Sequence, residues 1–239
     1  EDSAGRYFSF VASEDKSELM LYRLSLLLPP YFSENTFIRI FDLDPKELKK
    51  PSSMVSTKIL DENGANLASI LQTILRKKES SKKLTSLLKG FLPFVDNVSV
   101  EHNPDKSVSY KIKECYYNKS FYANFLSDGT VSILALILAL YFEDHSNIII
   151  LEEPERNIHP KLLANLISSA EDVSKEKQVI ITTHNPELLK YANCDDVRMV
   201  TRANCGNTSV TKPSDDLTIK TFLENDLGLE DLFVQGLLE

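Results

Sequence analysis

The stretch Asn124–Pro160, NFLSDGTVSILALILALYFEDHSNIIILEEPERNIHP, contains four features in a fixed order. A polar turn is followed by a long apolar run, a short burst of β-branched residues and two adjacent carboxylates, Glu152 and Glu153. A short, continuous apolar run rich in β-branched residues is typical of a buried strand in a parallel sheet. The order therefore places two acidic side chains at the carboxyl end of a central strand.

The apolar run within this stretch predicts a buried helix. Ser127 is well placed to cap its amino end, because a serine hydroxyl accepts a hydrogen bond from an unpaired amide of the first turn. Residues 131–142 are apolar apart from Ser132, so the helix has no polar face and should lie inside the protein. The run is too short to span a bilayer.

The segments that follow predict a parallel sheet. Residues 147–151 (NIIIL) and 178–183 (QVIITT) have the composition of buried strands, and the helix-like segment 159–175 between them has Pro160 near its first turn. A further helix-like segment, 185–192, comes after the second strand. A strand, a crossover helix and a second strand form a βαβ unit with a right-handed crossover. We therefore expect an α/β fold.

The rest of the chain predicts additions around this core. Strands are expected in 6–12 and 35–43, helices in 61–78 and 80–95, hairpins in 97–114 and 195–213, and acidic helices near the carboxyl end. We expect three regions: 1–123 with strands, helices and a hairpin, 124–213 with the α/β core, and 214–239 with the acidic helices.

The composition narrows the class of protein. The chain has 239 residues, 42% of them apolar, and a net charge of −8, which argues against a protein coated in nucleic acid but leaves room for a local basic face. Three widely spaced cysteines without a CxxC pair indicate a reducing compartment, and the first residues do not form a signal peptide. We expect a cytoplasmic protein without a membrane segment or a zinc site.

Polar side chains follow both strands of the βαβ unit. Glu152 and Glu153 follow the first strand, and His184 follows the second. Ligands of open α/β sheets bind beyond the carboxyl ends of the strands. Because successive strand residues point to opposite faces, one acid can hold a metal while the other faces a water. The alternative is that these acids lie at strand ends that meet solvent and favour the next helix N-terminus, and that the histidine is a capping or packing residue.

Three motifs in this order resemble an ABC-type ATPase of the RecF and SMC branch. They are FLSDGT before the apolar helix, IIILEEPERNIHP and IITTHNPELL. The resemblance extends to the stand-alone ATPases grouped with the overcoming-lysogenization-defect proteins and phage-defence systems. ILDENGANLASIL and LEDLFVQGLLE also resemble the middle and end of such proteins. The resemblance implies a P-loop NTPase fold with a parallel sheet, in which 1–123 is the middle part of the ATPase domain.

The resemblance also implies a role for each motif residue. Glu152 would hold Mg²⁺ in the Walker B strand, Glu153 would be the general base that positions the attacking water, and His184 would be the switch histidine that contacts the γ-phosphate of ATP. The resemblance implies two further sets of nucleotide contacts. The signature residues would act on the ATP of the partner subunit in a homodimer, and they are Ser127, Asp128, Gly129 and Thr130. The loop that crosses the dimer interface would contribute Asn157 and His159.

One motif of that family is absent from the sequence. A phosphate-binding P-loop has the pattern G-x-x-x-x-G-K-[ST], and none of the seven glycines belongs to one. We therefore expect the C-terminal part of a longer ATPase, with the Walker A lobe cut away or on another polypeptide. The isolated chain should bind and hydrolyse ATP poorly, and the parallel core should lack strands that it normally pairs with.

Partners follow from the same resemblance and from one basic cluster. The cluster is suited to non-specific contact with DNA phosphates, or is simply a solvated helix end: Arg76, Lys77, Lys78, Lys82 and Lys83. Any effector, such as a nuclease, would be a separate subunit. The ATPase and its effector would act in DNA repair or phage defence. The alternatives to an ATPase are an interaction module that kept the signature without turnover and a DNA-binding structural subunit.

Overall fold

The computed structural model describes residues 8–13, 37–54, 59–202, 206–225 and 227–238. Its centre is a six-stranded sheet with the order β10-β9-β1-β8-β7-β2. All neighbours are parallel except the β9–β10 pair. The strands are β1 (Phe8–Ser13), β2 (Ile38–Phe41), β7 (Ile148–Glu152), β8 (Gln178–Thr183), β9 (Val197–Arg202) and β10 (Thr208–Thr211). The predicted α/β fold with a parallel sheet is confirmed.

The predicted βαβ unit is formed by β7, α6 (Leu163–Val173) and β8. A single 3-10 turn, η2 (Pro160–Leu162), precedes α6, so Pro160 is at the first helical position as expected. β7 and β8 are parallel, with Ile150 opposite Ile180 and Glu152 opposite Thr182. The carboxyl ends of the two strands therefore lie side by side.

That the parallel core lacks strands it normally pairs with stays a prediction. Within the described residues its two strands have neighbours on both sides, because β7 pairs with both β2 and β8, and β8 pairs with both β1 and β7. The short apolar runs near the beginning of the sequence, 6–12 and 35–43, supply β1 and β2, which fill the positions on either side of the βαβ unit.

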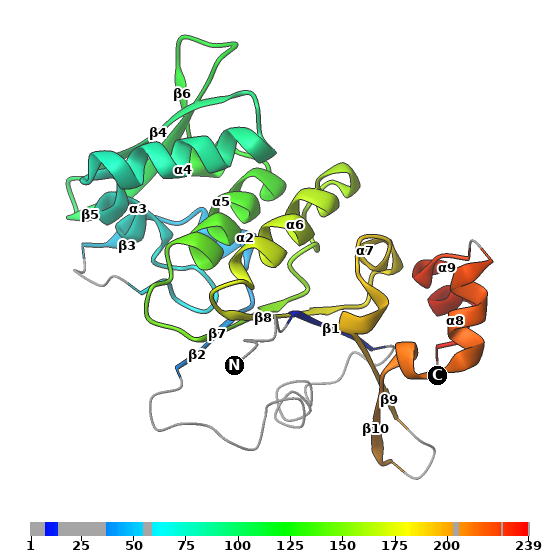
Figure 1. Cartoon of the computed structure of the whole chain (residues 1–239). Coiled ribbons are helices and arrows are strands. Elements are labelled where there is room, and N and C mark those ends of the chain that lie inside the picture. The colour runs from blue at the N-terminus through cyan, green and yellow to red at the C-terminus, as the bar shows by residue number, and fades with distance from the viewer. Residues whose placement is uncertain (1–7, 14–36, 55–58, 203–205, 226, 239) are drawn as a thin grey trace.

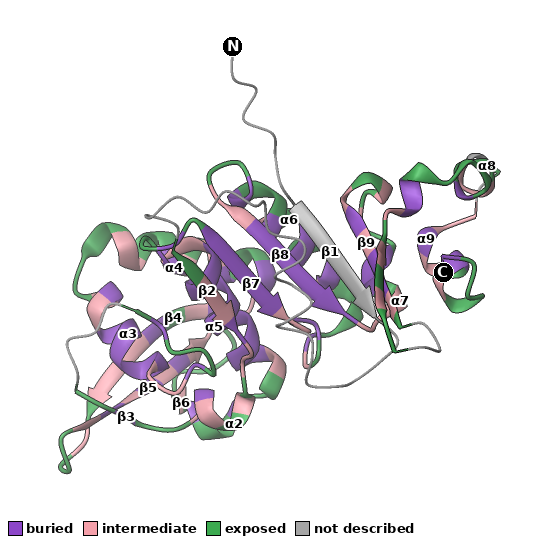
Figure 2. Ribbon diagram, turned by 90° about the horizontal axis from the view of Figure 1, so that it is seen from below, coloured by how far each residue is buried: buried purple, intermediate pink, exposed green. Residues whose placement is uncertain are grey.

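Residues of β7 divide between two apolar clusters, as strand alternation requires. Ile149 and Leu151 join the main core, whereas Ile148 and Ile150 pack in a smaller cluster with Ile180. Helices α5 (Asp128–Tyr141), α6 and α7 (Pro186–Leu189) lie together on one side of the sheet (Figure 1). β7 and β8 are buried along most of their length (Figure 2), which explains their apolar sequences.

A second, smaller sheet lies beside α5. Its strand order is β3-β5-β4, with β6 paired to β5, and α3 and α4 pack against it (Figure 1). The elements are α2 (Pro45–Leu48), β3 (Ser52–Ser53), α3 (Leu67–Leu75), α4 (Lys78–Phe91), β4 (Val95–His102), β5 (Ser107–Glu114), β6 (Ser120–Tyr122) and η1 (Ala123–Phe125). The predicted hairpin within 97–114 and the two helices before it are confirmed.

The final segments follow the sequence prediction. β9 and β10 form the expected antiparallel hairpin, and two helices, α8 and α9, follow it. The elements of this part are η3 (Cys194–Asp196), η4 (Pro213–Asp215), α8 (Leu217–Glu224) and α9 (Leu229–Val234). No helix in the part of the chain that the structure describes has the length and apolar character needed to cross a bilayer. The division at 123/124 and 213/214 stays a prediction.

Helix α5 is buried along most of its length and packs against α2, α4 and α6, so we predict that shortening one of its side chains is costly. Leu134 is 0% exposed, and Leu134→Ala should lower the free energy of unfolding by about 2–5 kcal/mol, because it opens a cavity in the core. Leu217→Ala is the control, because Leu217 is 77% exposed, and it should change this free energy by less than about 0.5 kcal/mol. Urea denaturation measures both, and similar losses would contradict this account of the core.

Candidate active site

The two acidic residues of the opening motif lie at the carboxyl edge of the central sheet. Glu152 is the last residue of β7, and it lies opposite Thr182 of β8. The amide of Glu153 donates a hydrogen bond to the carbonyl oxygen of Thr182 at 3.0 Å, so the chain turns away only after this residue. This is the edge at which ligands of open α/β sheets bind.

Glu153 has a backbone conformation that side chains rarely adopt. Its φ is +38°, and Lys106, in the β4–β5 turn, is the other non-glycine residue with positive φ in the described part of the chain. A left-handed backbone costs an ordinary residue on the order of 1–2 kcal/mol, and such strain concentrates at functional sites. Strand alternation therefore explains the direction of Glu152 only, because Glu153 lies in a strained turn beyond the strand.

Both carboxylate oxygens of Glu153 have nitrogen partners. His184 Nε2 lies 3.2 Å from Oε1, and Arg156 Nε donates to Oε2 at 2.9 Å. A terminal nitrogen of Arg156 also lies 3.3 Å from Oδ1 of Asp42, which directly follows β2. The structure thus brings Glu153 and His184 together as expected, and adds Asp42 and Arg156, which the sequence analysis missed.

The surroundings of Glu152 are rich in negative charge. Burial raises the pKa of its carboxyl, and the nearby carboxylates of Asp42 and Glu62 raise the pKa further. The described residues hold no cluster of three or more His, Cys, Asp or Glu side chains arranged around one ion. Mg²⁺ in nucleotide sites commonly takes only one or two carboxylates besides phosphates and waters. Glu152 therefore fits the part of a single protein ligand for Mg²⁺.

A third acid of the same loop, Glu155, is buried. Its side chain is 7% exposed, its Oε1 accepts a hydrogen bond from Thr183 Oγ1, and its buried Oε2 has no hydrogen-bond partner within the described residues. Burial raises the pKa of this carboxyl from 4.5 to about 7. Glu155 is not predictable from the sequence, because periodicity cannot show that a charged loop residue turns inward.

The residues SDGT form the amino end of α5, as predicted. Ser127 caps the helix: its Oγ accepts from the amide of Thr130 at 3.1 Å, and the two hydroxyl oxygens are 2.8 Å apart. Asp128, in the first turn, is paired with Lys49 at 2.5 Å. This pairing, which was not predicted from the sequence, joins the start of α5 to the end of α2.

Gly129 lies against the loop that follows β7. A Cβ added at Gly129 would lie 2.7 Å from the carbonyl oxygen of Asn157, so no larger residue fits without displacing that backbone. His159 is the cap of η2, with Nδ1 accepting from the amide of Lys161 at 3.2 Å. The predicted residues thus form two groups, one around Glu153 and one at the start of α5, and no hydrogen bond or ion pair joins them within the described residues.

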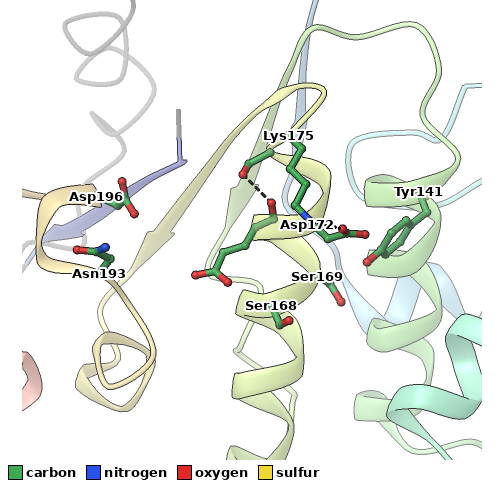
Figure 3. Close-up of a pocket in the computed structure, with 9 residues that line it drawn as sticks. Tyr141, Ser168, Ser169, Asp172, Lys175, Asn193 and Asp196 are labelled. Atoms are coloured by element: carbon green, nitrogen blue, oxygen red, sulfur yellow. Dashed lines mark hydrogen bonds and ion pairs between the residues drawn. The ribbon is translucent and has the colours of Figure 1, made fainter. Parts of the chain in front are cut away.

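A separate cavity of about 620 Å³ lies beside the end of α6 (Figure 3). Ser168, Asp172 and Lys175 line it from α6 and the turn after it, and Asn193 and Asp196 line it from the segment before β9. None of the predicted site residues lines it. Its walls come from segments that precede β8 and β9, whereas Glu152, Glu153 and His184 lie at the opposite, carboxyl end of the strands.

A protein-family model described as "AAA domain, putative AbiEii toxin, Type IV TA system" matches residues 43–190, which is more than half of the chain. The chain belongs to this AAA domain family. The match includes β7, β8, α5 and both groups of candidate site residues. No curated protein sequence matches the chain.

Solved structures similar to this AAA domain are SMC head domains. A SmcHead bound to the C-winged helix domain of ScpA is 14% identical, with a TM-score of 0.53 over 75% of this chain and 55% of that chain. An Smc head derived from Pyrococcus furiosus is 13% identical, with a TM-score of 0.45 over 68% of this chain and 44% of that chain. The SMC head domain from Thermotoga maritima is 20% identical, with a TM-score of 0.38 over 60% of this chain and 49% of that chain. The chain spans about half the length of these structures. The first likeness shows the fold alone, which is that of the Smc head.

The strain at Glu153 makes a prediction about stability. Glu153→Gly should raise the free energy of unfolding by about 1 kcal/mol, because glycine adopts positive φ without steric cost. Lys106→Gly, at φ +66°, is the matched control away from the site and should be stabilised in the same way. Urea denaturation of the 239-residue chain measures both. A gain at Lys106 without one at Glu153 would show that the contacts of the Glu153 carboxylate outweigh its strain.

Glu155 makes a prediction about pH. Its folded-state pKa is raised, so the folded state binds more protons than the unfolded state between pH 4.5 and about 7. The free energy of unfolding should therefore fall as pH rises through this window, by on the order of 3 kcal/mol from this group. Glu155→Gln should remove that part of the fall, and Glu176→Gln, at an exposed site, should keep it. Identical pH profiles for Glu155→Gln and the unaltered chain would contradict the burial of an ionisable carboxyl.

Proposed function

We propose that the chain supplies the Walker B, switch-histidine and signature parts of an ATP-hydrolysing ABC-type ATPase. The observation that carries the proposal is the group at the carboxyl edge of β7 and β8. There a strained Glu153 contacts His184, beside a half-buried Glu152 whose pKa is raised by burial and by its acidic neighbours. Strain and a perturbed pKa together favour a catalytic site over solvated strand ends.

Each residue of this group has a distinct task in the proposal. Glu152 would hold Mg²⁺, which supplies charge neutralisation for the phosphates of ATP. Glu153 would orient the attacking water and accept its proton, and His184 would contact the γ-phosphate while keeping Glu153 in place. Arg156 balances the charge of Glu153 and Asp42. Phosphoryl transfer depends mainly on such positioning and charge stabilisation.

The second group would serve the ATP of a second copy of the chain in a homodimer. The residues Ser127–Thr130 present the amino end of a long helix, where backbone amides and the helix dipole favour a phosphate. Asp128 would repel a phosphate, and its pairing with Lys49 offsets that charge. Asn157 contacts Gly129 through its carbonyl oxygen, and together with His159 it belongs to the loop proposed to lie at the dimer interface.

The proposal assigns no glycine-rich, phosphate-binding loop to the 239 residues. The strand beside β8, β1, is followed in the sequence by EDKSE, which contains no glycine. The residues that cradle the phosphates would therefore come from outside these 239 residues. The chain by itself would then bind and hydrolyse ATP poorly.

The ATPase would control a separate effector protein in the cytoplasm. The description of the matched family names a putative toxin and a Type IV TA system, and the proposed setting is DNA repair or phage defence. Non-specific DNA contact is a weaker part of the proposal. All five residues of the basic cluster are exposed, and Lys83 also donates to the carbonyl oxygen of Tyr141 and lies over its ring.

The test is ATP turnover by the natural protein in which this chain occurs. Glu153→Gln and His184→Ala should each lower kcat by about 10²–10⁴-fold, because they remove the base and its phosphate-facing partner. Glu176→Gln should not change kcat, since Glu176 is exposed and belongs to neither group. The isolated chain should be close to inactive.

A folded natural protein that binds ATP without hydrolysing it would overturn the enzyme reading. The alternative, an interaction or DNA-binding module that kept the ABC signature, would then stand. Equal turnover by the unaltered protein and Glu153→Gln would overturn the assignment of the base. Salt-dependent DNA binding that is the same with and without ATP would support the DNA-binding alternative.

A further inference from the structure

We propose that Glu155 is a positioning residue for the switch histidine. Its carboxyl accepts a hydrogen bond from the hydroxyl of Thr183. This bond holds the turn that contains His184 next to the loop that contains Glu153. The inference rests on the proposed function and goes beyond it, because it assigns a role to Glu155, a buried acid to which the proposed function gives none.

The contact lies at the end of β8. Thr183 is the last residue of this strand and is 0% exposed, and Glu155 is 7% exposed. Oγ1 of Thr183 donates to Oε1 of Glu155 and accepts from the amide of Asn185 at 2.9 Å. One hydroxyl therefore connects Glu155 to the residues on both sides of His184.

Glu155 is itself fixed to the loop after β7. The amide of Arg156 donates to the carbonyl oxygen of Glu153 at 3.1 Å, and the amide of Ile158 donates to the carbonyl oxygen of Glu155 at 2.9 Å. These bonds set the path of the backbone from Glu153 through Glu155. The bond from Thr183 to the side chain of Glu155 therefore fixes this loop relative to the end of β8.

The two contacts between these loops close a ring. Glu153 reaches His184 through its carboxylate at 3.2 Å, and Glu155 reaches Thr183, the residue next to His184, through its own carboxyl. A histidine held only by the first contact would pivot about the end of β8. The second contact removes that freedom, so the imidazole and the carboxylate of Glu153 keep one relative position.

The chemistry of the contact requires an acceptor but not a negative charge. Oε2 of Glu155 is buried without a partner in the described residues, and an ionised carboxylate in such surroundings is costly. A glutamine presents the same acceptor oxygen at the same place. An alanine would remove the acceptor and leave the hydroxyl of the fully buried Thr183 with no acceptor for its own hydrogen, although it still accepts from Asn185.

The test uses two disruptive variants and two conservative ones. In the natural protein, Glu155→Ala and Thr183→Val should each lower kcat for ATP by on the order of 10²-fold, because a misplaced catalytic group loses about that much. KM should change by less than about threefold, because uniform binding of ATP is left intact. The double variant should lose no more than either single one. Glu155→Gln and Thr183→Ser should keep kcat within about threefold.

Amide hydrogen exchange of the 239-residue chain supplies a readout that needs no ATP turnover. The amides of His184 and Asn185 should exchange at least about tenfold faster in Glu155→Ala and Thr183→Val than in Glu155→Gln. If the unaltered natural protein does not hydrolyse ATP, the proposed function fails. The exchange measurement then shows by itself whether the hydrogen bond between Thr183 and Glu155 fixes the turn at His184.

Three results would overturn the inference. The first is a loss of stability in Glu155→Ala with kcat unchanged, which would mean a purely structural role. The second is additive loss in the double variant, which would mean that the two side chains act separately. The third is unchanged exchange at His184 and Asn185 in both disruptive variants.

Discussion

The parallel pairing of β7 with β8 is the constraint on which the candidate site depends. The register places Glu152 opposite Thr182. Glu153 and His184 therefore follow the ends of two adjacent strands, and this pairing alone brings them close together. A shift of one residue would turn the buried isoleucines of β7 to the wrong faces, because side chains alternate along a strand. The apolar packing on both faces of the sheet therefore also sets the position of the acids.

Strain and burial at this edge are arranged around the same pair of loops. Glu153 has a positive φ, and Glu155, two residues later, has an unpaired buried oxygen. Both features cost stability, and both are retained where the loops after β7 and β8 meet. A protein that needed these segments only as connections would place glycine at the first position and an apolar residue at the second.

The elements of the fold were predictable where apolar residues form a continuous run or alternate with polar ones. Helix α5 and the strands β7 and β8 were found from their apolar runs, and the hairpin of β4 and β5 was found from its alternation. The contacts of charged loop residues were not predictable. Asp42 reaches Arg156 because β2 pairs with β7, and Lys49 reaches Asp128 because α2 packs against α5; these are tertiary neighbours without a local signal. The inward turn of Glu155 has the same cause.

The most direct test of the central claim is the structure of the natural protein with the Glu153→Gln substitution, bound to ATP and Mg²⁺. The account predicts an oxygen of Glu152 about 2.1 Å from Mg²⁺. It also predicts the γ-phosphate between His184 of one copy and the α5 amino end, Ser127–Thr130, of a second copy. Nucleotide bound elsewhere, for example in the cavity beside α6, with Glu152 and His184 not in contact with it, would contradict the account.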